Sequence, residues 1–447
     1  MSNSVAVQQR RFIQIAPDNN LATFSPVSSQ NILKFTIADT QALLQTKDLR
    51  LNFKISFHKA GGSNFTLGED VNIDANTGMN SVIDQLYISS LRFNTGQTLE
   101  AIHNSSRLSA SMYSALFSPK AHLANANMEQ KSVGKASFNE DSAGKGTDGG
   151  ANDPLKKLQR KALLKQVDVS MRLNAGVLMS QPMGIDLSQL GGMRLDIYLQ
   201  QNISAVLFGS AVGADAYYEI SDVSLTCPLL YKSMDMIQQS RNNPASAFNF
   251  LSYTSIYGVI DSTVSTLSHK VNFKGLVSVV QNSIMTDHIN NLSYNNNALE
   301  NFGGIRDIRF SRNGSRFPYE YDIVNDRESD EGIPTNSSNC NQALLLETYL
   351  SAYRNPEDIK RTSVCPQTTK GQLGVLDGNY GVGASFDSVS GAGINVNGNL
   401  AYNYSTKLED TDNASRNNTQ AYGVYSYYLT RNSIITGNQG GGLVVAN

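Results

Sequence analysis

Histidine is the side chain most often used for acid–base chemistry near neutral pH and for binding transition metals, and this chain has few. There are five in 447 residues. They are widely separated along the sequence: His58, His103, His122, His269 and His288. None forms an HxH or HExxH pattern, so we predict no metal site and expect scattered surface histidines.

Three other segments have residue types suited to catalysis. Asp287 and His288 could belong to a catalytic triad, but no GxSxG motif accompanies them. Residues 144–147 (GKGT) lack the upstream glycine, strand and helix of a phosphate loop. The acidic run 328–331, with Glu328, Asp330 and Glu331, would suit glycoside hydrolysis, yet a polar loop is the usual setting of such a run. We therefore predict no catalytic, cofactor-binding or metal-binding residue, no small-molecule substrate, and a protein that is not an enzyme.

Cysteines and apolar runs indicate the cellular setting. The three cysteines, Cys227, Cys340 and Cys365, are far apart and form no CxxC pair, so we expect reduced structural thiols in an intracellular environment. The first residues, MSNSVAVQQRR, lack the apolar centre of a signal peptide. No apolar run approaches the roughly 20 residues of a membrane helix. We expect synthesis in the cytosol and no membrane-spanning segment.

The charge balance argues against a general nucleic-acid binder. The chain has 36 basic and 38 acidic residues and a net charge of −2, without the basic excess that phosphate neutralisation requires. The basic segment 156–165 could contact nucleic acid or an acidic lipid surface. We favour an amphipathic approach to the next strand, with Leu155, Leu158 and Leu163 packed inward. Arg10 and Arg11 raise the same question more weakly.

Strict alternation of apolar and polar residues is the main structural signal. In residues 49–58, five apolar side chains alternate with polar ones, which predicts a strand with one buried face. The same alternation recurs in residues 167–173, 193–199 and 223–229, and residues 31–38 form a looser example. Strands with one wet face are typical of antiparallel sheets, because strands buried in parallel sheets read as continuous apolar runs.

Helices are expected to be few. Charged residues are only 17% of the chain, against about 25% in ordinary domains, so a helical bundle is disfavoured. Helical spacing occurs at 104–117, with Asn104 or Ser105 as the N-cap, and again at 341–353. A further short helix is expected near 233–240. The turn residues that follow it, at 241–245, mark the best domain boundary.

The order of elements indicates that one β domain occurs twice. Strand 84–92, a turn at 94–97 and helix 104–117 in the first half correspond to strand 305–310, the Asn313–Gly314 turn and helix 341–353. Residues 191–197 similarly match 398–404, and 216–218 match 421–422, with offsets of roughly 205–240 residues, about one β domain. Long polar segments, expected to be loops, lie at 132–154, 325–339 and 409–420. We predict an N-terminal arm (1–20), a first domain (21–232), a linker (233–247) and a second domain (248–447).

This order resembles that of the double jelly-roll major capsid proteins of icosahedral DNA viruses, in particular those of polinton-like viruses, virophages and adintoviruses. In the first half the similar segments are 24–29 (FSPVSS), 31–39 (NILKFTIAD), 49–57 (LRLNFKISF), 83–88 (IDQLYI), 96–102 (GQTLEAI) and 218–225 (YEISDVSL) with Pro228. In the second half they are 305–310 (IRDIRF) and 316–319 (RFPY). The resemblance spans nearly the whole chain, and it lies in element order and hydrophobic pattern.

The resemblance implies an all-β fold of two tandem eight-stranded antiparallel jelly rolls with a few short helices and long loops. Three chains would form a pseudo-hexameric homotrimer that tiles an icosahedral shell. The implied partners are copies of the chain, neighbouring capsomers, and penton and minor or cement proteins. The N-terminal arm would contact an internal membrane or the genome, and the location would be the virion, assembled inside the infected cell. No cofactor is implied.

Two other functions stay open at this point. The chain could be a minor capsid, spike or host-attachment protein of the same architecture. It could also be a carbohydrate-binding or carbohydrate-active β-sandwich protein, whose activity would depend on Asp and Glu residues of one cleft.

Overall fold

The fold is seen in a computed structural model. It describes residues 7–26, 31–66, 69–74, 77–92, 97–116, 163, 165–180, 184–233, 247–261, 266–297, 299, 305–324, 347–353, 381–386, 393–406, 421–435 and 444–446. Outside these residues lie His122, Cys340, Cys365, the GKGT segment, the acidic run 328–331, the helix expected near 233–240 and the long polar segments. Of the basic segment, Leu163 is described and buried, as the amphipathic interpretation requires.

The first half is a sandwich of two antiparallel layers. One layer has the order β1 (Val7–Ile15), β13 (Tyr217–Lys232), β5 (Arg50–His58), β9 (Val167–Arg172). The other has the order β3 (Ile32–Ile37), β11 (Met193–Leu199), β7 (Ile83–Ser90), β8 (Gln97–Ile102). The short strands β2 (Thr23–Phe24), β4 (Ala42–Leu44) and β10 (Ile185–Asp186) extend the first layer, and β6 (Asn72–Ile73) pairs with β12 (Leu207–Phe208).

These strands form where the sequence alternates. In β5, Leu51, Phe53, Ile55 and Phe57 are buried, while the residues between them are partly exposed. Burial of each such side chain stabilises the fold by roughly 1.5–3 kcal/mol relative to its exposure. The strands predicted at 31–38, 49–58, 167–173 and 193–199 are confirmed, and 223–229 lies inside the longer β13.

The second half repeats this arrangement with fewer breaks. One layer has the order β14 (Ala247–Ile260), β21 (Tyr422–Ile435), β15 (Thr266–Met285), β19 (Val382–Ser385). The other has the order β15, β20 (Ile394–Thr406), β16 (Ile305–Arg312), β17 (Ser315–Arg316). The strands β18 (Ile323–Val324) and β22 (Val444–Ala446) pair with β16 and β21.

Strand β15 belongs to both layers of the second half. Residues 266–276 pair with β20, and residues 276–285 pair with β21. The change of layer occurs at a register shift between Phe273 and Leu276, where Gly275 has φ of 72°. Glycine adopts a positive φ without the steric cost that a Cβ brings, so this position allows the strand to turn the corner. In the first half the same two roles are taken by the separate strands β3 and β5.

The pairing confirms the duplication predicted from element order. In each half the first strand pairs antiparallel with the last long strand, β1 with β13 and β14 with β21. In each half the matched segments also pair with each other, β7 with β11 and β16 with β20. The predicted Asn313–Gly314 turn joins β16 to β17, and both residues have positive φ, of 50° and 86°. Such a two-residue turn suits a tight hairpin.

The predicted N-terminal arm is partly a strand. It contains β1, so residues 7–15 belong to the first sandwich. The helix expected at 104–117 is α1 (Ser105–Leu116), and the described part of the second is helical at 347–352. The other described helices are short: α4 (Gly176–Met179), α5 (Leu187–Leu190), η1 (Thr46–Asp48), η2 (Gly78–Val82), η3 (Ile203–Ala205) and η4 (Thr286–His288). None of the helices in the described ranges is long and apolar enough to span a membrane.

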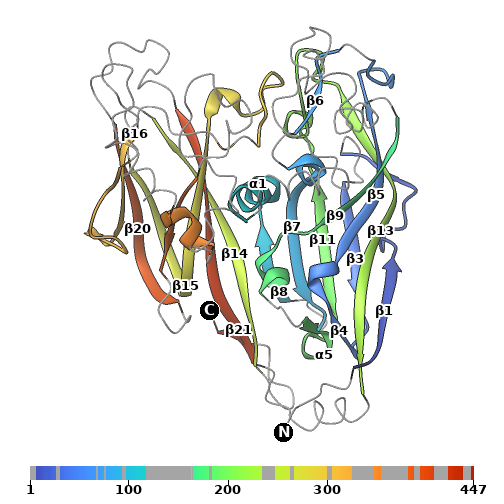
Figure 1. Ribbon diagram of the computed structural model, residues 1–447, viewed down its shortest axis with the longest axis horizontal. Helices are drawn as coiled ribbons and strands as arrows, with labels where there is room; N and C mark the ends of the chain where they lie inside the picture. The colour runs from blue at the N-terminus through green and yellow to red at the C-terminus, as the bar shows by residue number, and fades with distance from the viewer. Residues whose placement is uncertain are drawn as a thin grey trace.

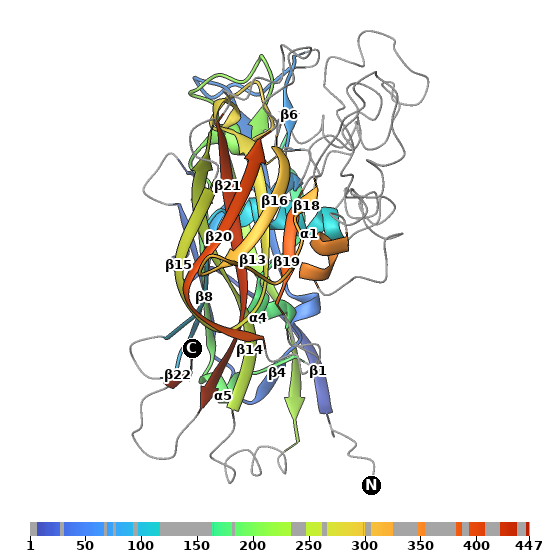
Figure 2. The same ribbon diagram turned by 90° about the vertical axis from the view of Figure 1, so that its left-hand side faces the viewer.

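The two halves stand side by side with their long strands upright, and α1 lies between them (Figure 1). The quarter turn in Figure 2 shows α1 and the helical turn at 347–352 on the same side of the sheets. One apolar core runs through the first sandwich and includes Phe248, Phe250, Tyr253 and Tyr427 from the second half. The halves therefore share a core at their contact, and the second sandwich has a further core of its own.

Candidate functional site at the junction of the two halves

A main-chain contact joins the sheets of the two halves. Strand β8 of the first half pairs parallel with β14 of the second at Ala101 and Thr254, whereas the other pairings between the described strands are antiparallel. Next to it, the backbone N–H of His103 donates to the Ser255 hydroxyl at 3.2 Å. One layer of the first sandwich, β3–β11–β7–β8, thereby joins the strands of the second half in a continuous 13-stranded sheet. Such a contact fixes the orientation of one sandwich against the other.

A buried carboxylate reinforces this contact. Glu100 on β8 accepts hydrogen bonds from the backbone N–H groups of Gly176 at 2.8 Å, Val177 at 2.9 Å and Tyr253 at 2.7 Å. Its side chain thus ties β8 to α4 and to β14. Burial raises the pKa of Glu100 to about 7, although the three N–H donors favour the charged form.

Helix α1 contributes buried polar groups to the junction. The Arg107 guanidinium lies 4.6 Å from the ring of Tyr425 and donates to the backbone carbonyl of Asn296. The carbonyl of Asn104 accepts from the Tyr427 hydroxyl at 2.9 Å. Ser111 bonds to the hydroxyl of Tyr349 at 2.6 Å and to that of Tyr353. All these partners of α1 come from the second half, so the helix connects the two sandwiches along its length.

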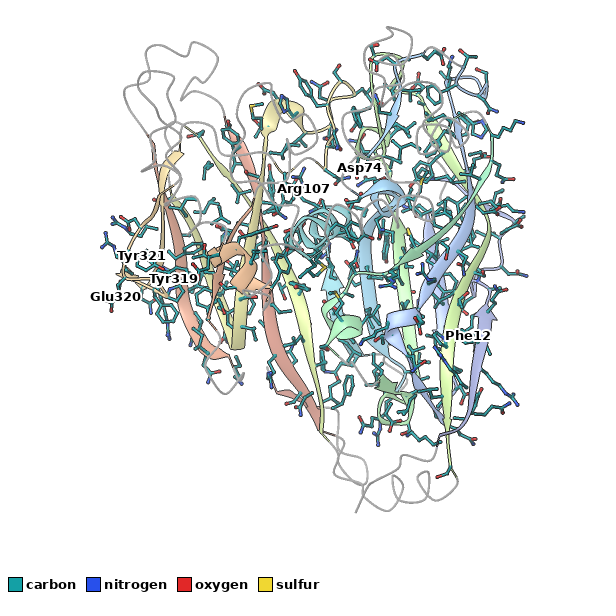
Figure 3. All side chains as sticks on the ribbon, viewed as in Figure 1. Phe12, Asp74, Arg107, Tyr319, Glu320 and Tyr321 are labelled. Carbon is teal, nitrogen blue, oxygen red and sulfur yellow. The ribbon has the colours of Figure 1, made fainter. Side chains whose placement is uncertain are left out.

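Two asparagines of the second half are inserted into the first. Asn297 donates to Asp74 at 3.0 Å and to the carbonyl of Ala205 at 3.0 Å, and it accepts from Ser106 at 3.0 Å. Asn296 donates to the carbonyl of Ser204 at 2.9 Å. Both asparagines are buried. Figure 3 shows Asp74 and Arg107 in the middle of the molecule, where the halves meet.

An apolar cluster completes the junction beside α1. Ala115 of α1 packs with Val280, Tyr349, Leu350 and Ala352 of the second half. A Cβ placed on Gly383 would come within 2.8 Å of the Cβ of Ala352, so the helical turn at 347–352 lies directly on β19. Buried hydrogen bonds and close packing together make the junction a rigid contact.

The histidines do not come together in the structure. His58 is partly buried and stacks on Tyr217, and His288 stacks on Tyr294 with ring centroids 3.7 Å apart. The expectation of surface histidines is wrong for His269, which is buried on β15 and bonds to the Tyr428 hydroxyl at 2.6 Å. It lies inside because Tyr428 satisfies its ring nitrogen. Burial lowers the pKa of His269.

The remaining candidate side chains, Asp287, His288 and Cys227, do not form a catalytic or metal-binding cluster with other described residues. Asp287 and His288 lie in η4, where His288 contacts an aromatic ring. Cys227 is buried and free, and burial raises its thiol pKa to about 12, as expected of a structural thiol. No group of three or more His, Cys, Asp or Glu that could hold a metal occurs among the described residues.

Sequence reasoning missed the junction residues. Asn296 and Asn297 lie in an asparagine-rich stretch that reads as a turn, and nothing local marks them as buried. The helix α1 carried a usable signal: apart from Arg107, its polar residues are all serine or tyrosine. Small hydroxyl side chains on a helix permit close packing with hydrogen bonds, which is the observed arrangement.

No family model and no curated protein matches this sequence. Solved structures do match it over nearly its full length. A structure of the Sputnik virophage has a TM-score of 0.59 at 12% identity, covering 98% of this chain and 88% of that chain. PBCV-1 VP54, fitted into a reconstruction of Sputnik, has a TM-score of 0.56 at 12% identity, covering 98% and 97%. The mavirus major capsid protein has a TM-score of 0.50 at 11% identity, covering 97% and 89%.

The fold is a double jelly roll. The strand orders agree with this assignment, since each half has two four-stranded layers with the same order of equivalent strands. The predicted fold class is confirmed. In this double jelly roll, a network of buried hydrogen bonds from Glu100, Arg107, Ser111, Asn296 and Asn297 connects the two halves.

Proposed function

We propose that this double jelly roll is a major capsid protein that assembles into homotrimeric, pseudo-hexameric capsomers of an icosahedral shell. The carrying observation is the duplicated sandwich, with both copies upright, side by side and fixed at a buried junction. Three chains related by a three-fold axis would present six similar barrels around that axis. A six-fold outline is what allows identical units to pack edge to edge in a facet.

The junction supports this role because tiling requires a constant angle between the two barrels of a chain. A loose linker would allow each barrel to turn. Here the main-chain pairing at Ala101 and Thr254, the Glu100 hydrogen bonds and the inserted Asn297 oppose such rotation. The full-length similarity to the mavirus major capsid protein and to a Sputnik structure adds to the case.

The chemistry of the surface also suits self-association. Charged residues make up 17% of the chain and the net charge is −2, so copies packed side by side repel one another little. The proposed partners are further copies, neighbouring capsomers, and penton and minor or cement proteins. The proposed location is the virion, with assembly inside the infected cell and with the N-terminal residues toward an internal membrane or the genome.

The domain division follows from the same proposal. We assign the first jelly roll to 21–232 with β1 added from the predicted arm, the linker to 233–247 and the second jelly roll to 248–447. Strand β13 ends at Lys232 and β14 begins at Ala247, which is compatible with that division.

Light scattering of the purified full-length chain, followed by negative-stain electron microscopy, tests the function. We expect a mass three times the 48.6 kDa of the chain and particles with a pseudo-hexagonal outline. A protein that stays monomeric at micromolar concentration and forms no hexagonal particles would contradict the proposal. Copy number in purified virions separates a major from a minor capsid protein, since a major subunit dominates the protein mass.

A further inference from the structure

We propose that the edge of the first jelly roll formed by β1, with Phe12, docks against the β16–β17 hairpin and the following segment 317–322 of a second copy. This inference rests on the proposed trimer and names the surfaces that would close it. Both surfaces belong to the described residues.

The junction inside one chain is the template for this contact. There, the last strand of one layer in the first half, β8, meets the first strand of the second half, β14. The strand orders make β17 the counterpart of β8, since β17 pairs with β16 as β8 pairs with β7. They make β1 the counterpart of β14, since each pairs with the last long strand of its half.

A closed ring of similar barrels must repeat one kind of contact. Within a chain, β8 meets β14. Between chains, the equivalent contact is β17 of one copy with β1 of the next. Such an interface is heterologous, because the two surfaces differ, and three copies close it into a ring. A two-fold dimer would instead bring identical surfaces together.

Both strands have an edge available for this contact. Within the described residues, β1 pairs only with β13, and β17 pairs only with β16. The two edges lie on opposite sides of the molecule: Figure 3 shows Phe12 at one side and Tyr319, Glu320 and Tyr321 at the other. This opposition is required if each copy is to contact one neighbour with each edge.

Each edge carries an exposed aromatic anchor. Phe12 is 60% exposed and Tyr321 is 45% exposed, the first and fourth highest values among the exposed large apolar side chains that the described residues contain. The Arg10 guanidinium lies 4.7 Å above the Phe12 ring, and Tyr321 stacks on Tyr319 with centroids 5.5 Å apart. Aromatic side chains held by such neighbours are typical of interface cores.

The two edges offer one pair of side chains of opposite charge. Arg11 on β1 is exposed and contacts the ring of Tyr231, with no ion pair among the described residues. Glu320 is exposed and likewise has no ion pair within the described ranges. Nearby, Arg10 pairs with Asp48 and Arg316 with Asp322. The Arg312 guanidinium donates to the backbone carbonyl of Asn395 and lies 5.8 Å from the Phe317 ring. Arg11 and Glu320 would therefore form one pair of opposite charges across the contact.

Two single substitutions test the contact. Phe12→Asp and Tyr321→Asp each place a charge in one of the two surfaces, and both positions are exposed, so the monomer fold should persist. We expect each variant to lose the trimer, with association weakened by roughly 30-fold or more, the size of a hot-spot effect. Tyr294→Asp is the matched control, since Tyr294 is 44% exposed and lies at neither edge. It should remain trimeric.

Mixing the two variants gives a sharper test. Phe12→Asp keeps an intact 317–322 surface, and Tyr321→Asp keeps an intact β1 edge. An equimolar mixture should therefore form a one-to-one heterodimer that neither variant forms alone, and that cannot close into a ring. The double charge exchange Arg11→Glu with Glu320→Arg should restore the trimer that each single exchange weakens.

The outcomes separate this inference from the proposed function. If the wild type is monomeric, the proposed function fails. If the wild type is trimeric and both aspartate variants stay trimeric with wild-type circular dichroism, the docking surfaces are wrong while the trimer stands. Loss of the trimer in Tyr294→Asp to the same degree, or a variant mixture without heterodimer, would also overturn the inference. Should either aspartate variant unfold, Phe12→Ser and Tyr321→Ser replace them.

Discussion

At the scale of single residues, the junction depends on a few buried polar groups whose partners lie in the other half of the chain. Glu100 accepts three backbone N–H groups, and Asn297 makes three hydrogen bonds across the junction. An unsatisfied buried group costs about 1–3 kcal/mol, so single substitutions here should have measurable effects.

Glu100 should make stability depend on pH. Its folded-state pKa of about 7 lies above the ordinary value of 4.5, so the folded protein binds the extra proton more tightly than the unfolded chain. The stabilisation that comes from protonated Glu100 is fully present below about pH 4.5 and is lost as pH rises through 7. Chemical denaturation at pH 5, 6, 7 and 8 measures it. In Glu100→Gln we expect a deficit of about 1–3 kcal/mol at pH 5, because the amide leaves the Val177 N–H without an acceptor.

That deficit should narrow as pH rises toward 8, since the variant carries no ionisable group at this position. If the free energy of unfolding depended on pH in the same way in the variant and the wild type, Glu100 would not be the source of the pH dependence. The control is Glu347→Gln, which makes the same chemical change at an exposed position.

Asn297→Ala should destabilise the junction. The substitution removes two donated hydrogen bonds and one accepted bond, and it leaves Asp74 and the Ala205 carbonyl short of a partner. We expect a loss of about 2–4 kcal/mol in the free energy of unfolding, measured by denaturant titration. The control is Asn291→Ala in the same loop, whose side chain bonds only locally at the surface. Equal losses of unfolding free energy in the two variants would show that the hydrogen bonds of Asn297 across the junction add no particular stability.

At the scale of elements, the corner in β15 is the feature most sensitive to substitution. Gly393 has φ of 70°, and a Cβ there would lie 2.7 Å from the backbone of Gly275 and Leu276. Gly393→Ala should therefore displace β20 from the corner and cost roughly 2–4 kcal/mol, in the range of strained or overpacked sites. Gly213→Ala is the control because its added Cβ meets no atom within 4 Å. Thermal denaturation of both variants measures the difference, and equal midpoints would contradict the prediction.

Elements with one wet face were predictable from the sequence, and elements buried on both faces were not. Strands β5 and β11 alternate strictly and were identified with nearly correct ends. The last part of β15 is buried on both faces from 276 to 284, yet four of these residues are polar (Ser278, Gln281, Asn282 and Ser283), so its sequence shows neither strict alternation nor a continuous apolar run. Strand β1 was missed because Phe12 projects outward while Ile13 and Ile15 pack inward, which disrupts the alternation.

The site was less predictable than the fold because its residues are ordinary ones placed by tertiary contacts. Asn297 meets Asp74 across 223 positions of sequence, and Ser111 meets Tyr349 across 238. Neither pair is close enough in the sequence to form a recognisable motif. The duplication was predictable from the sequence, because matched elements such as β7 and β16 keep the same order in both halves.

At the scale of the whole molecule, the shared core predicts that the two jelly rolls unfold together. Phe248, Phe250 and Tyr253 of the second half are buried in the core of the first. Differential scanning calorimetry of a dissociated variant such as Phe12→Asp should show one transition, with the calorimetric enthalpy equal to the van't Hoff enthalpy. Two resolved transitions, one for each half, would show that the barrels are independent.

The pairing of β8 with β14 also has a mechanical consequence. A load applied to one barrel reaches the other through main-chain hydrogen bonds and packed side chains, and not only through the covalent connection. A pair of barrels joined in this way bends less than two domains connected by a flexible linker. In a shell built from such pairs, every second boundary around a capsomer would be stiff, and fracture under internal pressure would follow the boundaries between chains.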